Sequence, residues 1–268
     1  MSARFSEVNS EHLSCSLDQR GLATIRLNRP PANALNVGVL EELAGAVLAA
    51  RFDPAVKVVA LRSAVPGYFS SGLDISEMES IDLSRLELLD HLFKDLLVRP
   101  IRTARKLFVA IIEGHCLGGG FELALAADLR LAVNGSWKCG LPEVRLGGMP
   151  GGGGMQLLAR LIGPSRALRM CLTGEPIAPT QAQALGAIDE LYEPERGAED
   201  VDAYLGTLLA GPVRAHGAIK LAIRQGMELS PEQGMLLERE LYRELYTSAD
   251  LAEGIQAFRE RRKPDFGR

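Results

Sequence analysis

The chain has 268 residues, of which 47% are hydrophobic and 24% are charged, and its formal net charge is −4. This balance predicts one large globular domain, or one domain with a helical appendage, with a sizeable buried core. The weak negative charge predicts no overall attraction to nucleic acid or to an anionic membrane, although the tail from Arg259 to Arg268 is locally basic.

The cysteines and histidines are few and scattered. The four cysteines form no C-x-x-C pair, which argues against a disulfide framework and a zinc site. No two of the four histidines have H-x-x-x-H spacing, so carboxylates are the expected carriers of any acid–base chemistry. Residues 1–13 lack the apolar run of a secretory signal, and no stretch is long enough to span a membrane. We therefore expect a cytoplasmic protein without a metal site.

The spacing of apolar and turn-forming residues predicts alternating strands and helices, the pattern of the α/β class. Two short strands are expected around a turn at 19–21, and Asn36 is expected to cap a helix at 37–52. The further expected elements are a strand at 56–64, a loop at 65–78, a helix at 84–106 bent or divided at Pro100, a strand at 107–114, a helix at 121–127, a strand at 129–134, a loop at 135–154, helices at 155–163 and 165–174, and a short helix and strand at 180–192.

Beyond residue 200 the pattern is mostly helical. We therefore expect a core domain at 1–200 and a C-terminal helical region at 201–268, which would be a separate layer or an oligomerisation region.

Three consecutive glycines, Gly118 to Gly120, stand just before a helix that contains Glu122. Glycine at a helix N-terminus lets a ligand approach the backbone N–H groups, but the same residues also suit a tight turn. Glu122 fits either an active site or the first turn of a helix, where an acid is favourable. The glycines match neither dinucleotide-binding nor P-loop spacing, and no G-x-S-x-G occurs, so an oxyanion-binding role stays open.

Two further features have a structural and a functional interpretation. In "FSSGLDISEM", residues 69–78, Gly72 allows a turn that leaves the Leu73 N–H free as a second donor. The alternative is an ordinary strand-to-helix turn capped by Asp74. Glu143 in "GLPEV" is the second carboxylate, or simply an acid after a proline at a turn.

Taken together, these features resemble the enoyl-CoA hydratase/isomerase (crotonase) family over nearly the whole chain. The matching stretches are "IRLNRPPANALN", "FSSGLDISEM", "AIIEGHCLGGGFELALAADLRLA", "CGLPEVRLGGMPGGGG", "LTGEPIAPTQAQALGAIDEL" and "SADLAEGIQAFRERRKPDF". The resemblance implies a crotonase-like spiral of ββα units with two stacked sheets at 1–200, followed by a helical trimerisation region. It also implies a trimer or a dimer of trimers.

The resemblance implies an acyl-CoA thioester substrate, with coenzyme A as part of the substrate and no separate cofactor. The thioester oxygen would lie between the N–H groups of Leu73 and Gly119, with Glu122 and Glu143 as catalytic acids and bases. The resemblance also implies a set of substrate- and coenzyme A-binding residues: Ala32, Ala34, Asp74, Ile75, Ser76, Gly118, Gly120 and, from a neighbouring subunit, Phe258 and Arg261. Simple helix packing is the alternative for Phe258.

Two glutamates favour hydration of a 2-enoyl-CoA to a 3-hydroxyacyl-CoA, because water must lose a proton while Cα gains one. The alternatives are a Δ3,Δ2-enoyl-CoA isomerase, an acyl-CoA thioester hydrolase, and a non-catalytic coenzyme A-binding subunit, which would not need both glutamates. Leu73, Cys139 and Met155 depart from the residues common in hydratases of the family. These departures leave the length and branching of the acyl group open.

Overall fold

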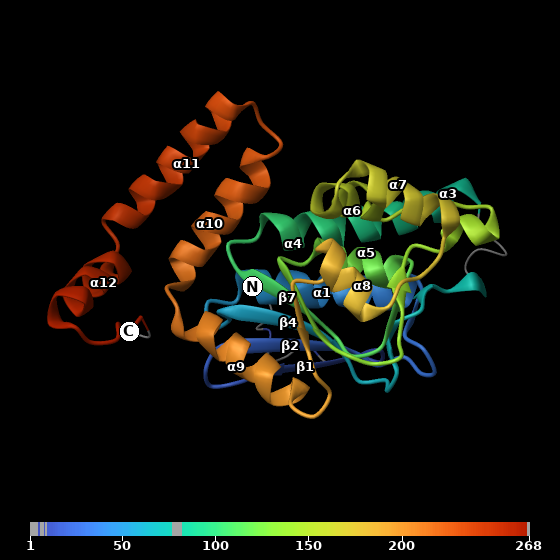
Figure 1. Ribbon diagram of the computed structural model, residues 1–268, viewed down its shortest axis with the longest axis horizontal. Coiled ribbons are helices and arrows are strands. Elements are labelled where there is room, and N and C mark those ends of the chain that lie inside the picture. Colours follow the sequence, from blue (N-terminus) through green and yellow to red (C-terminus); the bar gives the residue numbers. More distant parts are fainter. Residues whose placement is uncertain (1–4, 6–7, 9, 77–81, 267–268) are drawn as a thin grey trace.

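The computed structural model describes residues 5, 8, 10–76 and 82–266. Its largest sheet has the strand order β1–β2–β4–β7–β9–β11, in which β1 and β2 form an antiparallel hairpin and the other neighbours run parallel (Figure 1). The strands of this sheet are β1 (Leu13–Leu17), β2 (Leu22–Leu27), β4 (Val58–Ser63), β7 (Leu107–Ile112), β9 (Leu129–Val133) and β11 (Glu190–Tyr192).

Two small parallel sheets carry the loops that the sequence singles out. One has the order β10–β8–β5, and the other pairs β3 with β6. Their strands are β3 (Ala34–Leu35), β5 (Tyr68–Ser70), β6 (Gly72–Leu73), β8 (His115–Leu117) and β10 (Cys139–Gly140). The predictions of continuous loops at 65–78 and 135–154 were therefore wrong in part. These strands have two or three residues each, too few to give a readable period in the sequence.

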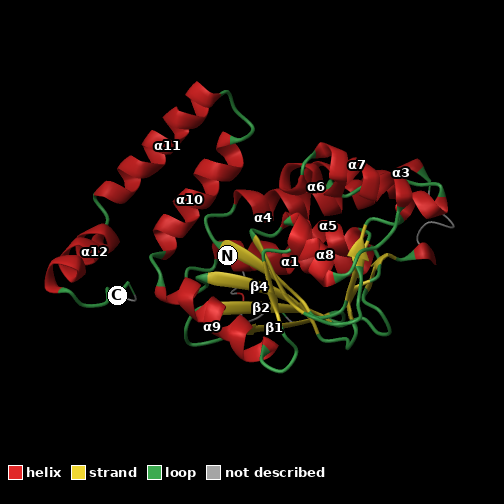
Figure 2. Cartoon of the chain, in the orientation of Figure 1, coloured by secondary structure: helices red, strands yellow, loops and turns green. Residues whose placement is uncertain are grey.

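Helices cover both faces of the large sheet (Figure 2). The helices of the described part of the chain, including those of the C-terminal arm, are α1 (Val37–Phe52), α3 (Leu83–Asp90), α4 (Arg99–Thr103), α5 (Gly119–Ala126), α6 (Gly154–Ile162), α7 (Pro164–Thr173), α8 (Pro179–Leu185), α9 (Gly197–Ala210), α10 (Val213–Gly226), α11 (Pro231–Tyr246) and α12 (Ala249–Glu260), with a π-helical segment η2 (His91–Val98) and a 3-10 turn η3 (Glu143–Leu146).

The first helix shows how the sequence sets these boundaries. The Asn36 side chain accepts a hydrogen bond from the Val39 N–H at 2.9 Å, which satisfies one of the unpaired donors at the helix start. The helix α1 begins at the next residue and ends at Phe52, as predicted from the sequence.

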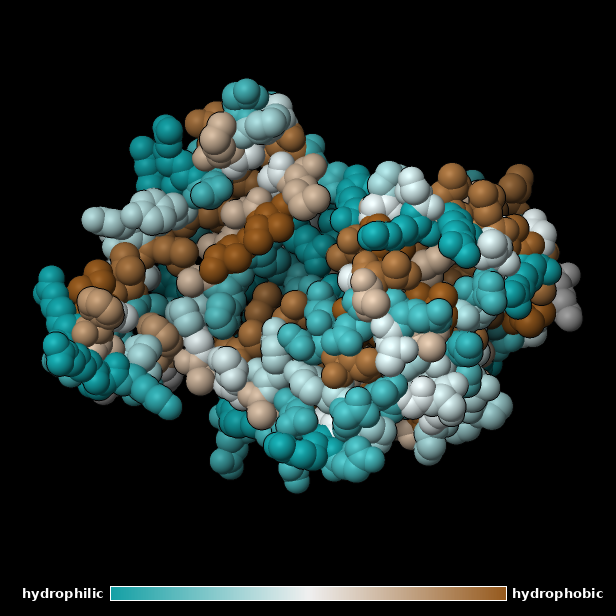
Figure 3. Space-filling view, in the orientation of Figure 1, coloured by the Kyte–Doolittle hydropathy of each residue, from teal (hydrophilic) through white to brown (hydrophobic). Residues whose placement is uncertain are grey.

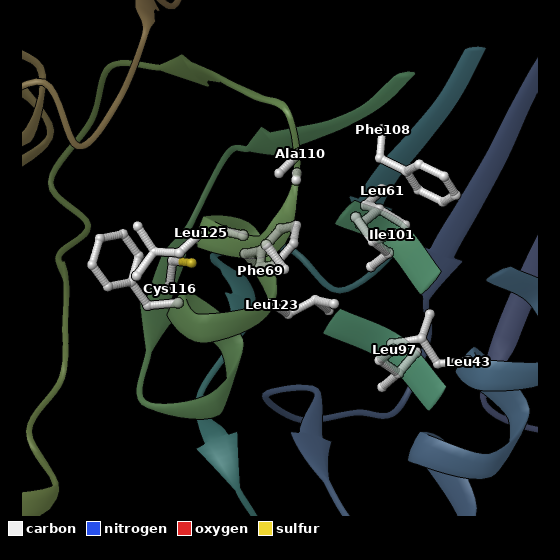
Figure 4. Packing of buried hydrophobic residues seen from close by; sticks show 14 of the residues in the cluster. Leu43, Leu61, Phe69, Leu97, Ile101, Phe108, Ala110, Cys116, Leu123 and Leu125 are labelled. Atoms are coloured by element: carbon white, nitrogen blue, oxygen red, sulfur yellow. The ribbon is translucent and has the colours of Figure 1, made fainter. Parts of the chain in front are cut away.

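The core lies on both sides of the large sheet because alternate strand residues point to opposite faces. In β4, Val59 and Leu61 belong to the main core, whereas Val58 and Ala60 pack with residues of α9. Figure 4 shows part of the main core, with side chains from α1, the π-helical segment and α5. The α9 residues in the smaller core are Val201, Leu205 and Leu209.

The segment predicted as one helix at 84–106 runs from Leu83 to Thr103 and has a π-helical middle. The Arg99 N–H donates to the Lys94 carbonyl, five residues back, and Pro100 follows at the start of α4. Proline has no N–H, so it fits at the start of a helical segment, where that group has no partner. The helix thus changes from π to α geometry beside Pro100 while its backbone stays helical across Val98 and Arg99, and it ends three residues earlier than predicted.

The helices α10 to α12 form an arm that extends away from the sheets (Figure 1). Lys220 anchors α10 to the body: its buried Nζ donates to the carbonyl oxygens of Ile101 at 2.6 Å and Lys106 at 2.8 Å, and pairs with Asp128 at 2.8 Å. The preceding helix α9 packs on the sheet and begins at Gly197, so the arm itself starts at Val213. The domain division at residue 200 stays a prediction.

Among the described residues, every helix is too short or too polar to cross a lipid bilayer. In the same part of the chain, no three His, Cys, Asp or Glu side chains are grouped as metal ligands would be.

Candidate active site

A cavity of about 630 Å³ opens between the β3–β6 pair, the helices around the π-helical segment, the start of α5 and the loop at η3. It brings together eight of the residues predicted for the site: Ala34, Leu73, Asp74, Ile75, Gly118, Gly119, Glu122 and Glu143. Residues more than 100 positions apart in the sequence thus form one wall, which is the arrangement that the predicted chemistry requires.

The remaining predicted residues lie outside the lining. The Ala32 carbonyl accepts from the N–H of Ser71, a lining residue, at 2.9 Å, and Ser76 Oγ donates to Asp74 Oδ1 at 2.7 Å. Phe258 and Arg261 lie on and just after α12, in the arm, and do not line the cavity of their own chain. Phe258 is 85% exposed, so it is not packed within its own chain.

Each of the glycines at positions 118 to 120 has a different structural role. Gly118 has φ 51°, and a Cβ there would lie 3.1 Å from Glu143 Oε1, so a side chain would strain the backbone and press on that carboxyl group. A Cβ on Gly120 would lie 2.6 Å from the Cβ of Ser70, which holds the helix start close against β5. Gly119 is the first residue of α5, where the N–H has no partner within the helix.

The loop that contains Leu73 packs directly against this helix start. A Cβ on Gly119 would lie 3.6 Å from the Leu73 nitrogen, and a Cβ on Gly72 would lie 3.3 Å from the Gly119 nitrogen. Both residues line the cavity. The two N–H groups therefore come to the same place, and such a pair of donors can stabilise an oxyanion.

Glu122 lies in the first turn of α5 and is only 3% exposed. Its Oε1 accepts from the Gly154 N–H at 2.8 Å, at the start of α6. Burial raises the pKa of Glu122, and backbone hydrogen bonds from Gly154 and Gly152 oppose that rise, as does the charge of Lys94. Hydrogen bonds from N–H groups favour the ionised carboxylate, so Glu122 is suited to accept a proton.

Glu143 begins the 3-10 turn η3 and has a different environment. Its Oε2 is buried and has no hydrogen-bond partner among the residues that the structure describes. Burial and, to a smaller extent, the charge of Glu122 raise the pKa of Glu143 to about 7, against the opposing effect of a hydrogen bond from its own backbone N–H. A buried carboxyl group with one unpaired oxygen and a second carboxylate nearby favours its protonated form, so Glu143 is suited to donate a proton.

The contacts of Glu122 include two residues that the sequence analysis did not single out. A Cβ on Gly154 would lie 2.5 Å from Glu122 Cγ, and a Cβ on Gly152 would lie 2.8 Å from Glu122 Oε2 and 2.5 Å from the Phe93 ring. The run "PGGGG" thus gives space for the buried carboxylate and supplies N–H donors to it. The sequence signal for this role is the glycine run directly before a helix, because N–H groups at a helix start bind anions.

Asp74 at the edge of the cavity forms an ion pair with Arg29 at 2.7 Å and accepts from the Ser76 N–H at 3.1 Å. Hydrogen bonds from Ser76 and Arg29 lower the pKa of Asp74. The charge of Asp74 is therefore neutralised by Arg29, and its hydrogen bonds to Ser76 hold the turn after Leu73. This agrees with the structural interpretation of Asp74 as a capping residue.

Comparison with known proteins identifies the family of the chain. Residues 18–268 match the family described as Enoyl-CoA hydratase/isomerase. The chain belongs to this family. It is 35% identical over 259 residues to methylglutaconyl-CoA hydratase, mitochondrial, of Mus musculus, across 93% of this chain and 80% of that protein. It is 35% identical over 254 residues to 2,3-dehydroadipyl-CoA hydratase of Escherichia coli, across 92% of this chain and 96% of that protein.

Among solved structures, the chain superimposes on "Enoyl-CoA hydrates" from Geobacillus Kaustophilus HTA426 with a TM-score of 0.92, at 37% identity and over 97% of each chain. The crotonase-like α/β fold predicted from the sequence is thereby confirmed, as is membership of the enoyl-CoA hydratase/isomerase family.

Proposed function

We propose that this family member is an enoyl-CoA hydratase, a hydro-lyase that adds water across the 2,3 double bond of a 2-enoyl-CoA to give a 3-hydroxyacyl-CoA. One observation carries the proposal: two carboxyl groups in unlike environments, Glu122 and Glu143, line one cavity together with the Leu73 and Gly119 N–H groups. The hydratase names of the two relatives support it. Coenzyme A would enter as part of the substrate.

The proposed mechanism uses the two carboxyl groups in opposite roles. The ionised Glu122 takes a proton from water as the water oxygen attacks Cβ, and protonated Glu143 gives its proton to Cα. Negative charge that develops on the thioester oxygen is stabilised by the N–H groups of Leu73 and Gly119. The pair holds one proton before and after the reaction, and the proton returns to Glu143 through solvent.

Crotonyl-CoA tests the proposal directly. Hydration removes the conjugated double bond, so the absorbance of that bond should decline while 3-hydroxybutyryl-CoA accumulates. A 3-enoyl-CoA that gains this absorbance would instead identify a Δ3,Δ2-enoyl-CoA isomerase. Release of a free thiol from either substrate would identify a thioester hydrolase.

The raised pKa of Glu143 predicts a pH dependence. Hydration needs the form of the pair that holds one proton, and Glu143 loses that proton as the pH passes about 7. The kcat/KM for crotonyl-CoA should therefore fall about tenfold for each pH unit well above that value. Melting curves across the same range provide the control. A profile that stays level up to about pH 9 would show that a protonated Glu143 is not required.

The arm predicts self-association. Figure 3 shows hydrophobic surface along the arm. The large apolar side chains that this part of the chain exposes are Ile219, Ile223, Met227, Met235, Leu236, Tyr242, Tyr246, Ile255 and Phe258. An exposed apolar face of this extent is typical of an interface. We expect light scattering to give the mass of a trimer or a dimer of trimers at micromolar concentration. A stable monomer would contradict both this prediction and the role of Phe258 and Arg261 at a neighbour's coenzyme A site.

A further inference from the structure

The turn that carries Glu143 also brings a cation to the cavity. Arg145 lines the same cavity, and its side chain forms no ion pair or hydrogen bond with any residue that the structure describes. The other charged lining residues are accounted for. Asp74 pairs with Arg29, Asp90 pairs with Lys94, and the two glutamates serve the chemistry. Within the described lining, Arg145 is thus a positive charge that nothing balances.

The position of Arg145 relative to Glu143 is fixed by η3. A 3-10 turn rises about 2 Å per residue, so the Cα of Arg145 lies about 4 Å beyond that of Glu143 along the turn axis. The stem of Arg145 is held against the end of α7, where a Cβ on Gly174 would lie 3.1 Å from Arg145 Cγ. The turn and this contact hold the stem of Arg145 at the cavity, two residues from Glu143, and leave its side chain exposed.

A bound substrate changes the surroundings of this cation. An acyl-CoA that fills the cavity removes water from the guanidinium, and an arginine without water needs an anion in its place. With the thioester oxygen at Leu73 and Gly119 and Cα at Glu143, an acyl chain that continues along η3 would pass Arg145. An anion on the distal end of a short acyl chain would therefore meet Arg145.

We propose that Arg145 binds a carboxylate at the distal end of the acyl chain. The substrate class would be the coenzyme A monothioester of a short unsaturated dicarboxylic acid, an inference that rests on the proposed hydratase function. Arginine presents two parallel N–H donors that match the two oxygens of a carboxylate. The acyl groups in the names of two relatives, methylglutaconyl and 2,3-dehydroadipyl, derive from dicarboxylic acids, whereas a third relative, 34% identical, is named for the monocarboxylic crotonyl group, so the proposal rests on Arg145.

The test compares two substrates of equal length. 2,3-Dehydroadipyl-CoA has six acyl carbons and a terminal carboxylate, whereas 2-hexenoyl-CoA has six and a terminal methyl group. The parent protein should hydrate the dicarboxylic substrate with a kcat/KM about tenfold or more above that of hexenoyl-CoA. Arg145→Leu should lower kcat/KM for dehydroadipyl-CoA by about tenfold to hundredfold, mainly through KM, and leave that for hexenoyl-CoA within about threefold.

Two variants complete the comparison. Arg145→Lys keeps the charge but loses the two-pronged geometry, so it should recover only part of the preference. Arg166→Leu removes an exposed arginine of α7 that does not line the cavity, and both substrates should react as with the parent. Equal kcat/KM for the two substrates in parent and Arg145→Leu would overturn the inference and leave the hydratase proposal standing.

Binding of saturated ligands separates this inference from the catalytic proposal. Calorimetry should show that the parent binds adipyl-CoA about tenfold more tightly than hexanoyl-CoA, and that Arg145→Leu abolishes the difference. If neither enoyl substrate is hydrated but this difference is found, the hydratase proposal fails and the carboxylate site stands. If Arg145→Leu weakens both ligands equally, Arg145 contacts a phosphate of coenzyme A, and the inference is overturned.

Discussion

Replacement of Glu143 by glutamine is expected to lower the hydration of crotonyl-CoA by about two to four orders of magnitude, the usual contribution of a positioned acid or base. Glutamine keeps the size and hydrogen-bonding groups of the side chain but can neither give nor take a proton. The proposed hydration needs a proton delivered to Cα, and migration of a double bond also needs a proton moved on the acyl chain. Glu143→Gln should therefore abolish both reactions.

Glu122→Gln should separate the two reactions. The amide oxygen of glutamine can still accept the Gly154 N–H that now binds Glu122 Oε1 at 2.8 Å, but the amide nitrogen cannot accept the Gly152 N–H, so melting curves must show that the variant stays folded. Hydration should fall by about two to four orders of magnitude because no group deprotonates the water. Any migration activity should survive in part, because migration uses no water.

Both assays should be run on the same preparations, with melting curves to exclude unfolding. Glu175→Gln, which changes an exposed glutamate outside the cavity, is the matched control and should react as the parent does. Near-parent hydration by Glu122→Gln, together with a collapse of migration, would identify an isomerase and refute the proposed function.

The sequence predicted best those parts of the fold that depend on local interactions. Asn36 caps α1 because an amide oxygen can reach the Val39 N–H three residues on, whatever the rest of the chain does. The hairpin at 19–21 and the long strands likewise follow from alternation and turn residues. The short strands β3, β6 and β10 have two residues each, and only the pairing partner makes them strands.

The site shows the same limit. Each carboxylate and each N–H donor was recognised through a motif. The residues alone, however, were equally compatible with a purely structural role for each of them. Glu122 is an example. Its buried carboxylate is stabilised by the N–H groups of Gly152 and Gly154, some 30 positions later in the chain. No local pattern contains that contact, which arises only when α6 packs against α5. The same holds for Phe93, which lies beside Gly119 and Gly152 because a π-helical segment places its ring there.

Removal of one backbone donor is expected to have the second large effect. Gly119→Pro deletes the N–H proposed to bind the thioester oxygen, and turnover should fall about a hundredfold or more. The change suits the backbone, because proline is favoured at the first position of a helix. Gly118, which precedes it, has no Cβ to collide with the proline ring. The fold and the affinity for free coenzyme A should therefore change little.

Gly119→Ala distinguishes loss of the hydrogen bond from loss of space. Alanine keeps the N–H, and its Cβ would meet Leu35 Cδ1 at 3.4 Å and the Leu73 nitrogen and the Phe93 ring at 3.6 Å, which are ordinary contact distances. Its turnover should therefore stay well above that of Gly119→Pro, in single-turnover assays that exclude product release. If alanine is as harmful as proline, bulk at the cavity rather than the donor explains the loss. If proline leaves turnover within a few-fold of the parent, Gly119 serves only as a turn residue, and the thioester oxygen must be held elsewhere.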